Sequence, residues 1–153
     1  MGKTTTAVNL AAALAAGGST VLVIDTDPQG NASTALGVDH RAGIPSVYDV
    51  LVEDAPLADV VHECPDIPGL TCVPATIDLA GAEIELVSFV AREMRLQRAV
   101  NAFVAQSENP PDYILIDCPR ASGCSPSTPS WPAVRSSSRS SASTTRSRVS
   151  RCS

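Results

Sequence analysis

The first residues of the chain, Gly2–Thr5, have the residue types of a phosphate-binding site. They read Gly-Lys-Thr-Thr and run directly into an apolar helical pattern. A helix that begins here points unpaired backbone N–H groups and the positive end of its dipole at the preceding loop, where a polyphosphate is stabilised. A lysine in this position reaches the β- and γ-phosphates, and the hydroxyl residue that follows ligates Mg²⁺. The sequence therefore predicts the closing half of a phosphate-binding loop.

Acidic residues at the ends of two apolar runs would complete a site for magnesium-dependent phosphoryl transfer. Asp25 and Asp27 follow the run 21–24, and Asp117 ends the run 113–117. In open parallel sheets ligands bind beyond the carboxyl ends of the strands, so we expect these carboxylates to lie near the Gly-Lys-Thr sequence. This chemistry needs a lysine for phosphate charge, a hydroxyl and a carboxylate for the metal, and a polar group that orients water. Each residue alone is also typical of a turn or a solvated surface, but their joint spacing favours the site.

The elements that position these residues follow from the apolar pattern. An alanine-rich helix is expected over residues 3–16, ended by Gly17 and Gly18, and a long helix over 78–106, with a break near 87–88. Continuous apolar runs predict strands that are buried on both faces. The expected strands are 21–24, 70–73 and 113–117, and two further short helices are expected at 46–52 and 57–62. Helices that alternate with such strands indicate an α/β fold with a parallel sheet and right-handed crossovers.

Charge divides the 153-residue chain into two parts. Residues 1–119 hold five basic and all sixteen acidic residues, a net charge of −11, whereas residues 120–153 hold six arginines and no acid, a net charge of +6. The second part is rich in Ser, Arg and Pro and has no hydrophobic periodicity, so it is expected to be disordered. We therefore predict one globular domain over residues 1–119 and a disordered tail over 120–153.

The composition favours a cytoplasmic protein without a membrane span, a zinc site or a disulfide framework. No run approaches the eighteen or so apolar residues that a membrane span needs. The five cysteines form no Cys-x-x-Cys pair. In a reducing compartment they are expected to be mostly packed thiols.

Four stretches carry a resemblance to a known family: Gly2–Thr5, Asp25–Asn31, Leu79–Glu83 and Asp112–Pro119. They read GKTT, DTDPQGN, LAGAE and DYILIDCP, and with them residues 1–119 resemble the ParA/Soj chromosome- and plasmid-partitioning ATPases. That family belongs to the deviant Walker A (SIMIBI) branch of P-loop NTPases. The resemblance implies a three-layer α/β sandwich around a parallel sheet, and an ATPase that uses ATP and Mg²⁺ to drive DNA segregation.

The resemblance implies that the first stretch binds the nucleotide. Gly2, Lys3, Thr4 and Thr5 would surround the phosphates, with Lys3 in contact with their charge and Thr5 hydrogen-bonded to the α-phosphate. Thr4 would ligate Mg²⁺.

The carboxylates take the remaining implied roles. Asp27 would position or activate the attacking water, with Lys3 as the second catalytic group. Asp25 would support the loop that carries Asp27, and Asp117 would hold the metal through water. Intact members of the family are cytoplasmic and nucleoid-associated, bind ATP as a homodimer, bind DNA non-specifically and respond to a ParB-type partner. No membrane contact is implied.

The chain departs from the family pattern near both ends. The family reads Lys-Gly-Gly-Val-Gly-Lys-Thr, and this sequence begins at the position of the Val, so the first strand and the signature lysine are absent. A start codon placed inside the motif would explain this. From Arg120 the family pattern stops, yet codons for residues 142–149 can be written so that another frame encodes EYYALEG, a family-like string. We therefore expect a truncated fragment with a frame-shifted tail and little or no turnover. The DNA sequence around codon 120 tests the frame shift.

Other functions remain open from the sequence. The chain would be a non-functional remnant if it neither folded nor bound nucleotide. A septum-site MinD-like ATPase would need a C-terminal amphipathic membrane helix, and the tail has no apolar face. The arginines of the tail are also typical of a nucleic-acid-binding arm, although Trp131 is its sole aromatic residue. A nitrogenase-iron-protein-like function would need two cluster cysteines, whereas Cys118 is expected to be a packed thiol.

Overall fold

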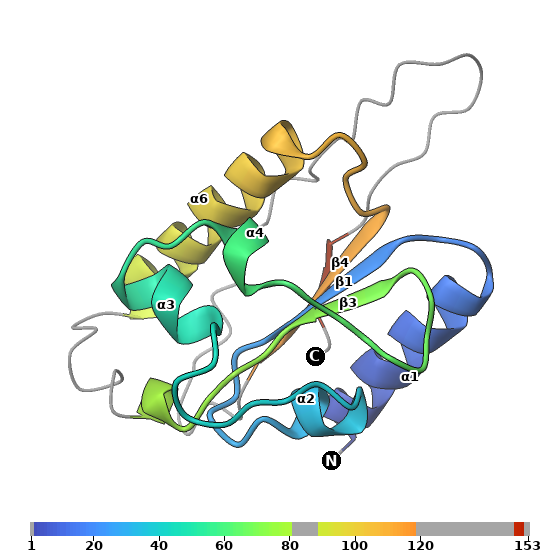
Figure 1. Ribbon diagram of the computed structural model, residues 1–153, viewed down its shortest axis with the longest axis horizontal. Coiled ribbons are helices and arrows are strands. Elements are labelled where there is room, and N and C mark those ends of the chain that lie inside the picture. Colours follow the sequence, from blue (N-terminus) through green and yellow to red (C-terminus); the bar gives the residue numbers. More distant parts are fainter. Residues whose placement is uncertain (1, 81–88, 119–148, 152–153) are drawn as a thin grey trace.

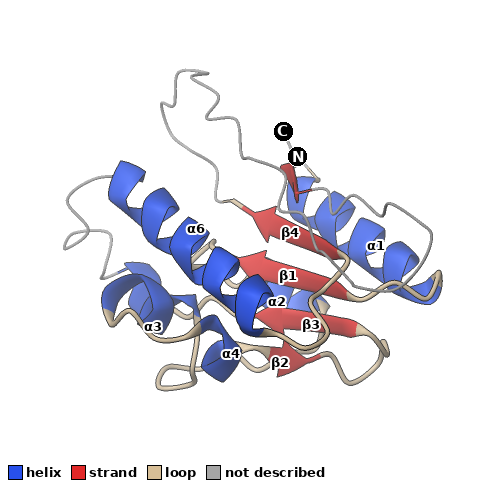
Figure 2. Cartoon of the chain, turned by 90° about the horizontal axis from the view of Figure 1, so that it is seen from above, coloured by secondary structure: helices blue, strands red, loops and turns tan. Residues whose placement is uncertain are grey.

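The computed structural model describes residues 2–80, 89–118 and 149–151 of the chain. Within these residues a five-stranded sheet in the order β2-β3-β1-β4-β5 lies between two layers of helices (Figures 1 and 2). The predicted α/β class is confirmed, with a sheet that is mostly parallel.

The central strand, β1 (Val21–Asp25), is buried along its whole length. It pairs in parallel with β3 (Leu70–Val73) on one side and with β4 (Tyr113–Asp117) on the other. β3 and β4 have the predicted bounds, and β1 extends one residue beyond the predicted run 21–24, to Asp25. Asp25 pairs in register with Asp117, so the two carboxyl ends lie side by side at one edge of the sheet.

The first described helix, α1 (Lys3–Ala16), has the predicted bounds and packs on one face of the sheet together with α2 (Asn31–Ala35) (Figure 2). It buries Ala7, Ala11 and Ala15, which are spaced four residues apart and therefore share one side of the helix. Their small side chains let α1 lie close to β1 and β4.

The opposite face of the sheet is covered by α3 (Val47–Val52), α4 (Leu57–Val60) and α6 (Phe89–Gln106) (Figure 2). The side chains of Leu22 and Ile24 point into this layer and belong to its core cluster, whereas the alternate residues of β1 belong to the cluster beneath α1. Burial of each such side chain stabilises the fold by about 1.5–3 kcal/mol.

One predicted helix needs correction. The helix expected over 57–62 ends at Val60, and His62–Glu63 form β2, which pairs antiparallel with β3. Without β2 the outer edge of β3 would leave backbone N–H and C=O groups unpaired, and even a two-residue strand satisfies some of them. Tertiary pairing therefore prevails over the helical pattern at this position.

The long helix expected over 78–106 is described in two pieces. Residues 78–80 form a helical turn, and α6 begins at Phe89. Residues 81–88, which contain the predicted break, lie outside the described residues. The short helix α2 was not predicted, because its sequence Asn-Ala-Ser-Thr-Ala carries no apolar stripe.

The predicted tail enters the described structure at β5 (Val149–Arg151), which pairs in parallel with β4. At these three residues the expectation of a segment without regular structure is corrected. The outer edge of β4 would otherwise leave backbone groups unpaired, and an extended segment that includes a β-branched Val satisfies them. Residues 119–148 lie outside the described residues, so the domain boundary at residue 119 stays a prediction.

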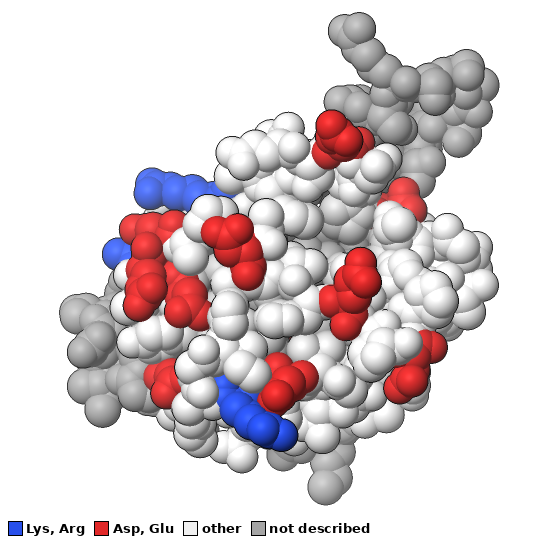
Figure 3. Space-filling view, in the orientation of Figure 1, with Lys and Arg blue, Asp and Glu red and all other residues white. Residues whose placement is uncertain are grey.

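Acidic side chains are spread over the face of the molecule in Figure 3, with few Lys or Arg side chains between them. This follows from the net charge of −11 over residues 1–119. Among the described helices, none has the length and apolar character that crossing a membrane would require.

Candidate functional site

The N-terminus of α1 is open to a ligand. Gly2 precedes the helix with a φ of 99°, in the left-handed region that favours glycine, and no side chain caps this end of the helix. A Cβ at Gly2 would meet nothing within 4 Å, so the backbone conformation and not space requires the glycine. Lys3 and Thr5 are exposed and Thr4 is half-buried. The first turn thus presents uncapped N–H groups of the kind that bind phosphate oxygens.

Asp117, the last residue of β4, carries a buried carboxylate without a donor. It is 1% exposed, and neither carboxylate oxygen has a hydrogen-bond partner among the described residues. Burial raises the pKa of Asp117 above the ordinary value of a carboxyl, and the charge of Asp27 also raises it. The nearby Thr4 hydroxyl and the Lys3 ammonium lower this pKa. The Thr4 hydroxyl is therefore close enough to act on the carboxylate, but not in good hydrogen-bonding geometry.

Lys3, Thr4 and Asp27 therefore lie within electrostatic reach of Asp117. A buried ionised carboxylate is costly unless a cation or a donor compensates it, so this arrangement fits a divalent cation. Mg²⁺ commonly takes one or two carboxylates together with phosphate oxygens and water. Among the described residues there is no cluster of three or more His, Cys, Asp or Glu side chains that could hold a metal ion.

Asp25 is completely buried and anchors the loop that follows β1. Its Oδ1 accepts the N–H of Asp27 at 3.0 Å, and its Oδ2 accepts both the N–H and the hydroxyl of Ser33, at 3.0 and 2.8 Å. Burial raises the pKa of Asp25, these hydrogen bonds lower it, and the charge of Asp117 raises it slightly. Both carboxylate oxygens of Asp25 thus accept hydrogen bonds from protein donors, which suits a structural support better than a ligand.

The loop 26–30 is also fixed to the end of β4. The N–H and the hydroxyl of Thr26 both donate to the main-chain oxygen of Asp117, at 3.0 and 2.7 Å. Within the loop, Asp27 Oδ1 accepts the N–H of Gln29 at 3.0 Å, which orients the carboxylate. The backbone that carries Asp27 is therefore tied to the backbone that carries Asp117.

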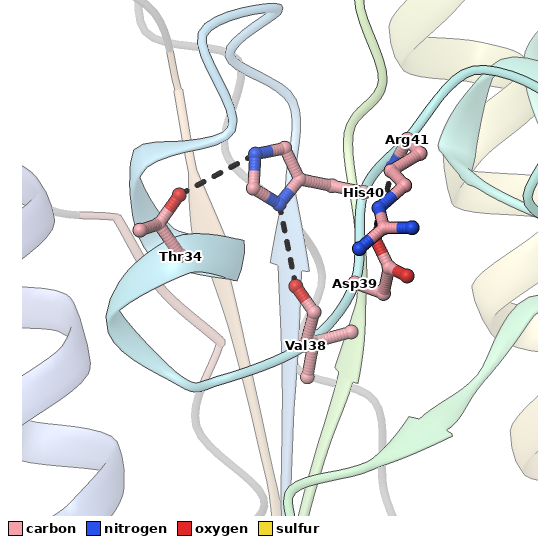
Figure 4. A network of polar contacts seen from close by, with 5 residues as sticks. All are labelled: Thr34, Val38, Asp39, His40 and Arg41. Carbon is pink, nitrogen blue, oxygen red and sulfur yellow. Dashed lines mark hydrogen bonds and ion pairs between the residues drawn. The ribbon is translucent and has the colours of Figure 1, made fainter.

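His40 packs against this loop, a contact that the sequence did not reveal (Figure 4). Gly30 has a φ of 61°, and a Cβ there would lie 2.8 Å from His40 Cδ2 and 3.2 Å from the Ala75 carbonyl oxygen. The His40 ring nitrogens lie 3.5 Å from the Thr34 hydroxyl and 3.3 Å from the Val38 carbonyl oxygen (Figure 4). The His40 ring and the Ala75 carbonyl oxygen therefore leave no room for a side chain at residue 30.

Two cavities lie away from these residues. One, of about 580 Å³, lies between the α3–α4 segment and α6, and another, of about 420 Å³, lies near the amino ends of β1 and β3. Neither is lined by Lys3, Asp27 or Asp117. The carboxylates instead lie at the carboxyl ends of the strands, the position that open α/β sheets use for ligands.

The described cysteines agree in part with expectation. Cys64 and Cys72 are buried, and burial raises the pKa of Cys64 to about 11 and raises that of Cys72 as well, so both thiols stay protonated at neutral pH. Cys118 directly follows β4 and is exposed, so the expectation of a packed thiol is wrong for this residue.

Known proteins share both the sequence and the fold. A family model described as an AAA domain matches residues 1–127. The sporulation initiation inhibitor protein Soj of Bacillus subtilis is 50% identical over 123 residues, which are 80% of this chain and 47% of that protein. The chromosome partitioning protein ParA of Caulobacter vibrioides is 48% identical over 119 residues, 78% of this chain and 43% of that protein. The chain thus spans less than half the length of these relatives.

A solved structure with bound nucleotide and magnesium shares the fold. Cobyrinic acid a,c-diamide synthase from Mycobacterium smegmatis, with a bound ATP analogue and magnesium, superposes with a TM-score of 0.65 at 39% identity. The superposition covers 78% of this chain and 47% of that one. Because the family model matches residues 1–127, the chain belongs to the AAA-domain family of P-loop proteins, and ParA and Soj proteins are among its relatives.

Proposed function

We propose that this chain binds Mg-ATP beside the N-terminus of α1 and hydrolyses it as a partitioning-type ATPase. The observation that supports this most is Asp117, which is 1% exposed, has no hydrogen-bond partner among the described residues and lies within reach of Lys3 and Thr4. The bound ATP analogue and magnesium of the structure at 39% identity lend further support.

The first turn of α1 binds the triphosphate. Backbone N–H groups of Gly2–Thr5 donate to phosphate oxygens, the Lys3 ammonium neutralises the β- and γ-phosphate charge, and the Thr5 hydroxyl donates to the α-phosphate. The Thr4 hydroxyl and, through water, Asp117 would hold Mg²⁺, and the ion would neutralise charge on the phosphate oxygens.

Asp27 orients the attacking water in line with the γ-phosphate. Its carboxylate is turned by the Gln29 N–H, and its backbone is fixed by Asp25. Lys3 stabilises the charge that develops on the phosphoryl oxygens during transfer.

Turnover by this chain is proposed to be weak. Lys3 is the sole lysine among the 153 residues given, so a single lysine is available here to neutralise phosphate charge. Comparison of kcat with that of a full-length Soj or ParA protein tests this point, and equal values would contradict it.

Partners and location are proposed from the same resemblance. They are an ATP-dependent homodimer, non-specific DNA, a ParB-type partner and a cytoplasmic, nucleoid-associated location. The described residues carry an excess of acidic side chains, which repel the DNA backbone, so DNA binding is expected to need residues outside them.

Nucleotide titration of the purified chain tests the proposal. A non-hydrolysable ATP analogue is expected to bind in Mg²⁺ and not in EDTA. Lys3→Ala is expected to weaken binding about tenfold or more, because it removes a charge-assisted contact to phosphate. Asp27→Ala is expected to keep affinity within about threefold and to lower kcat about a hundredfold. Arg98 is an exposed cation on α6, so Arg98→Ala is the matched control for Lys3→Ala. It should change neither the affinity for nucleotide nor kcat.

The competing function is that of a remnant without nucleotide binding. A melting temperature that does not change between buffer and Mg-ATP, in a chain that is folded by circular dichroism, would favour the remnant.

A further inference from the structure

Ser33, on α2, joins three segments through one buried hydroxyl. The residue is completely buried, and its hydroxyl donates to Asp25 Oδ2 at 2.8 Å. The same hydroxyl oxygen accepts the N–H of Ala75, just after β3, at 3.3 Å. The Ser33 side chain therefore connects the end of β1, the short helix α2 and the segment that follows β3.

The Asp25 carboxylate connects Ser33 to the backbone of Asp27. While Oδ2 is held by the N–H and hydroxyl of Ser33, Oδ1 accepts the N–H of Asp27 at 3.0 Å. Because Asp25 and Ser33 are both completely buried, bulk water cannot replace a missing donor at this carboxylate. The orientation of one carboxylate thus fixes the backbone on which the Asp27 side chain is mounted.

We infer that Ser33 is a positioning residue for Asp27, which it holds in place through the Asp25 carboxylate. The catalytic consequence rests on the proposed ATPase function, whereas the structural consequence does not need nucleotide. The Ser33 hydroxyl is occupied by Asp25 and Ala75, so it acts on the reaction only through them. Hydrogen bonds behind a reactive group decide whether that group is held in the geometry that the reaction requires.

Ser46 provides a matched control. It is the same residue type, is also buried at 1% exposure, and caps α3 by accepting the N–H of Tyr48. Its hydroxyl lies 3.3 Å from both the Thr76 hydroxyl and Asp49 Oδ2, and it makes no hydrogen bond with Asp25. Ser46→Ala therefore removes an equally buried hydroxyl that does not contact the support of Asp27.

Amide hydrogen exchange of the full chain without nucleotide tests the positioning directly. Ser33→Ala is expected to raise exchange at the Asp27 amide about five- to tenfold, the effect of weakening one hydrogen bond to a charged group. In Ser33→Ala the amides of β1 should keep their exchange rates. The Ser46→Ala variant, compared at an equal loss of melting temperature, should show no rise in exchange at the Asp27 amide. Equal increases in both variants, or no increase in Ser33→Ala, would overturn the inference.

Kinetics supply the second test. Ser33→Ala is expected to lower kcat at least about fivefold while the Kd for the Mg-bound ATP analogue stays within about twofold, and Ser46→Ala should leave kcat unchanged. In a double-mutant cycle, adding Ser33→Ala to Asp25→Asn should cost little more than Asp25→Asn alone, because both act through the same contact. Additive losses would contradict the mechanism. A wild-type chain that binds no nucleotide would refute the proposed function, and the exchange experiment would still decide the positioning role.

Discussion

At the scale of single residues, the site is marked by the contrast between two buried carboxylates. Asp117 has no hydrogen-bond donor among the described residues, whereas Asp25, next to it in the sheet, has three. The contrast separates a support from a ligand, since a group that must bind a metal keeps its oxygens available. Such sites reduce stability in favour of function.

Replacement of Asp117 by Asn is therefore expected to stabilise the Mg²⁺-free protein at neutral pH, by on the order of 1 kcal/mol. Burial raises the pKa of Asp117 in the folded state, so the penalty on folding grows as the pH rises from the ordinary carboxyl value to that raised pKa, and it is complete above it. The advantage of Asp117→Asn should shrink as the pH falls through the raised pKa towards the ordinary carboxyl value. Urea denaturation in EDTA at several pH values measures this.

The control for this prediction is Asp112→Asn. Asp112 Oδ2 accepts the N–H and the hydroxyl of Thr20, at 2.9 and 3.1 Å, so its replacement should destabilise the chain. Two variants that both destabilise at pH 7 would show that Asp117 is compensated after all.

Gly30 tests the packing of the loop that carries Asp27. Gly30→Ala is expected to cost about 1–2 kcal/mol for its left-handed backbone, and more because its Cβ would meet the His40 ring at 2.8 Å. Gly43→Ala, which has a φ of 86° and open space around it, isolates the backbone cost. His40→Ala should recover part of the loss in the Gly30→Ala background. Equal costs at Gly30 and Gly43 in thermal denaturation would argue against the His40 contact.

At the scale of elements, the caps of short helices carry predictable stability. Ser46 and Asp49 form a capping box at the start of α3: the Ser46 hydroxyl accepts the Tyr48 N–H, and Asp49 accepts the Ser46 N–H at 2.7 Å. Ser46→Ala is expected to lower the free energy of unfolding by about 1 kcal/mol. Ser107→Ala, which removes a half-buried hydroxyl at the far end of α6, should cost less. An unchanged urea midpoint for Ser46→Ala would contradict the role of the cap.

The elements that the sequence predicted are those with a strong local signal. β1, β3 and β4 are continuous apolar runs, and α1 has a clear end at Gly17. β2 and α2 are too short to have periodicity, and they form because neighbouring elements need a partner or a cover. Ser33 and His40 were missed for the same reason, since their contacts join residues that only the tertiary structure brings together.

At the scale of the whole molecule, the sheet explains why residues far apart in the sequence meet. Parallel pairing of β1 with β4 aligns Asp25 with Asp117, and α1 packs beneath both strands. The motifs alone predicted the grouping of Lys3, Asp27 and Asp117, because parallel strands direct their carboxyl ends to one edge. The residues between them contribute scaffold and two layers of core.

Ligand linkage gives a prediction for the whole molecule. A nucleotide that binds only the folded chain at a hundred times its Kd should stabilise it by about 2.7 kcal/mol. The melting temperature should therefore rise in Mg-ATP and stay constant in ATP with EDTA. A rise that is independent of Mg²⁺ would indicate binding elsewhere.

Paramagnetic relaxation by Mn²⁺, used in place of Mg²⁺ together with an ATP analogue, tests the central claim most directly. Amide signals of Lys3–Thr5, Asp27 and Asp117 are expected to broaden together, while that of Gly69, at the opposite end of the strands, stays sharp. Broadening that spares one of these three groups, or that reaches Gly69 first, would contradict a single magnesium–triphosphate site.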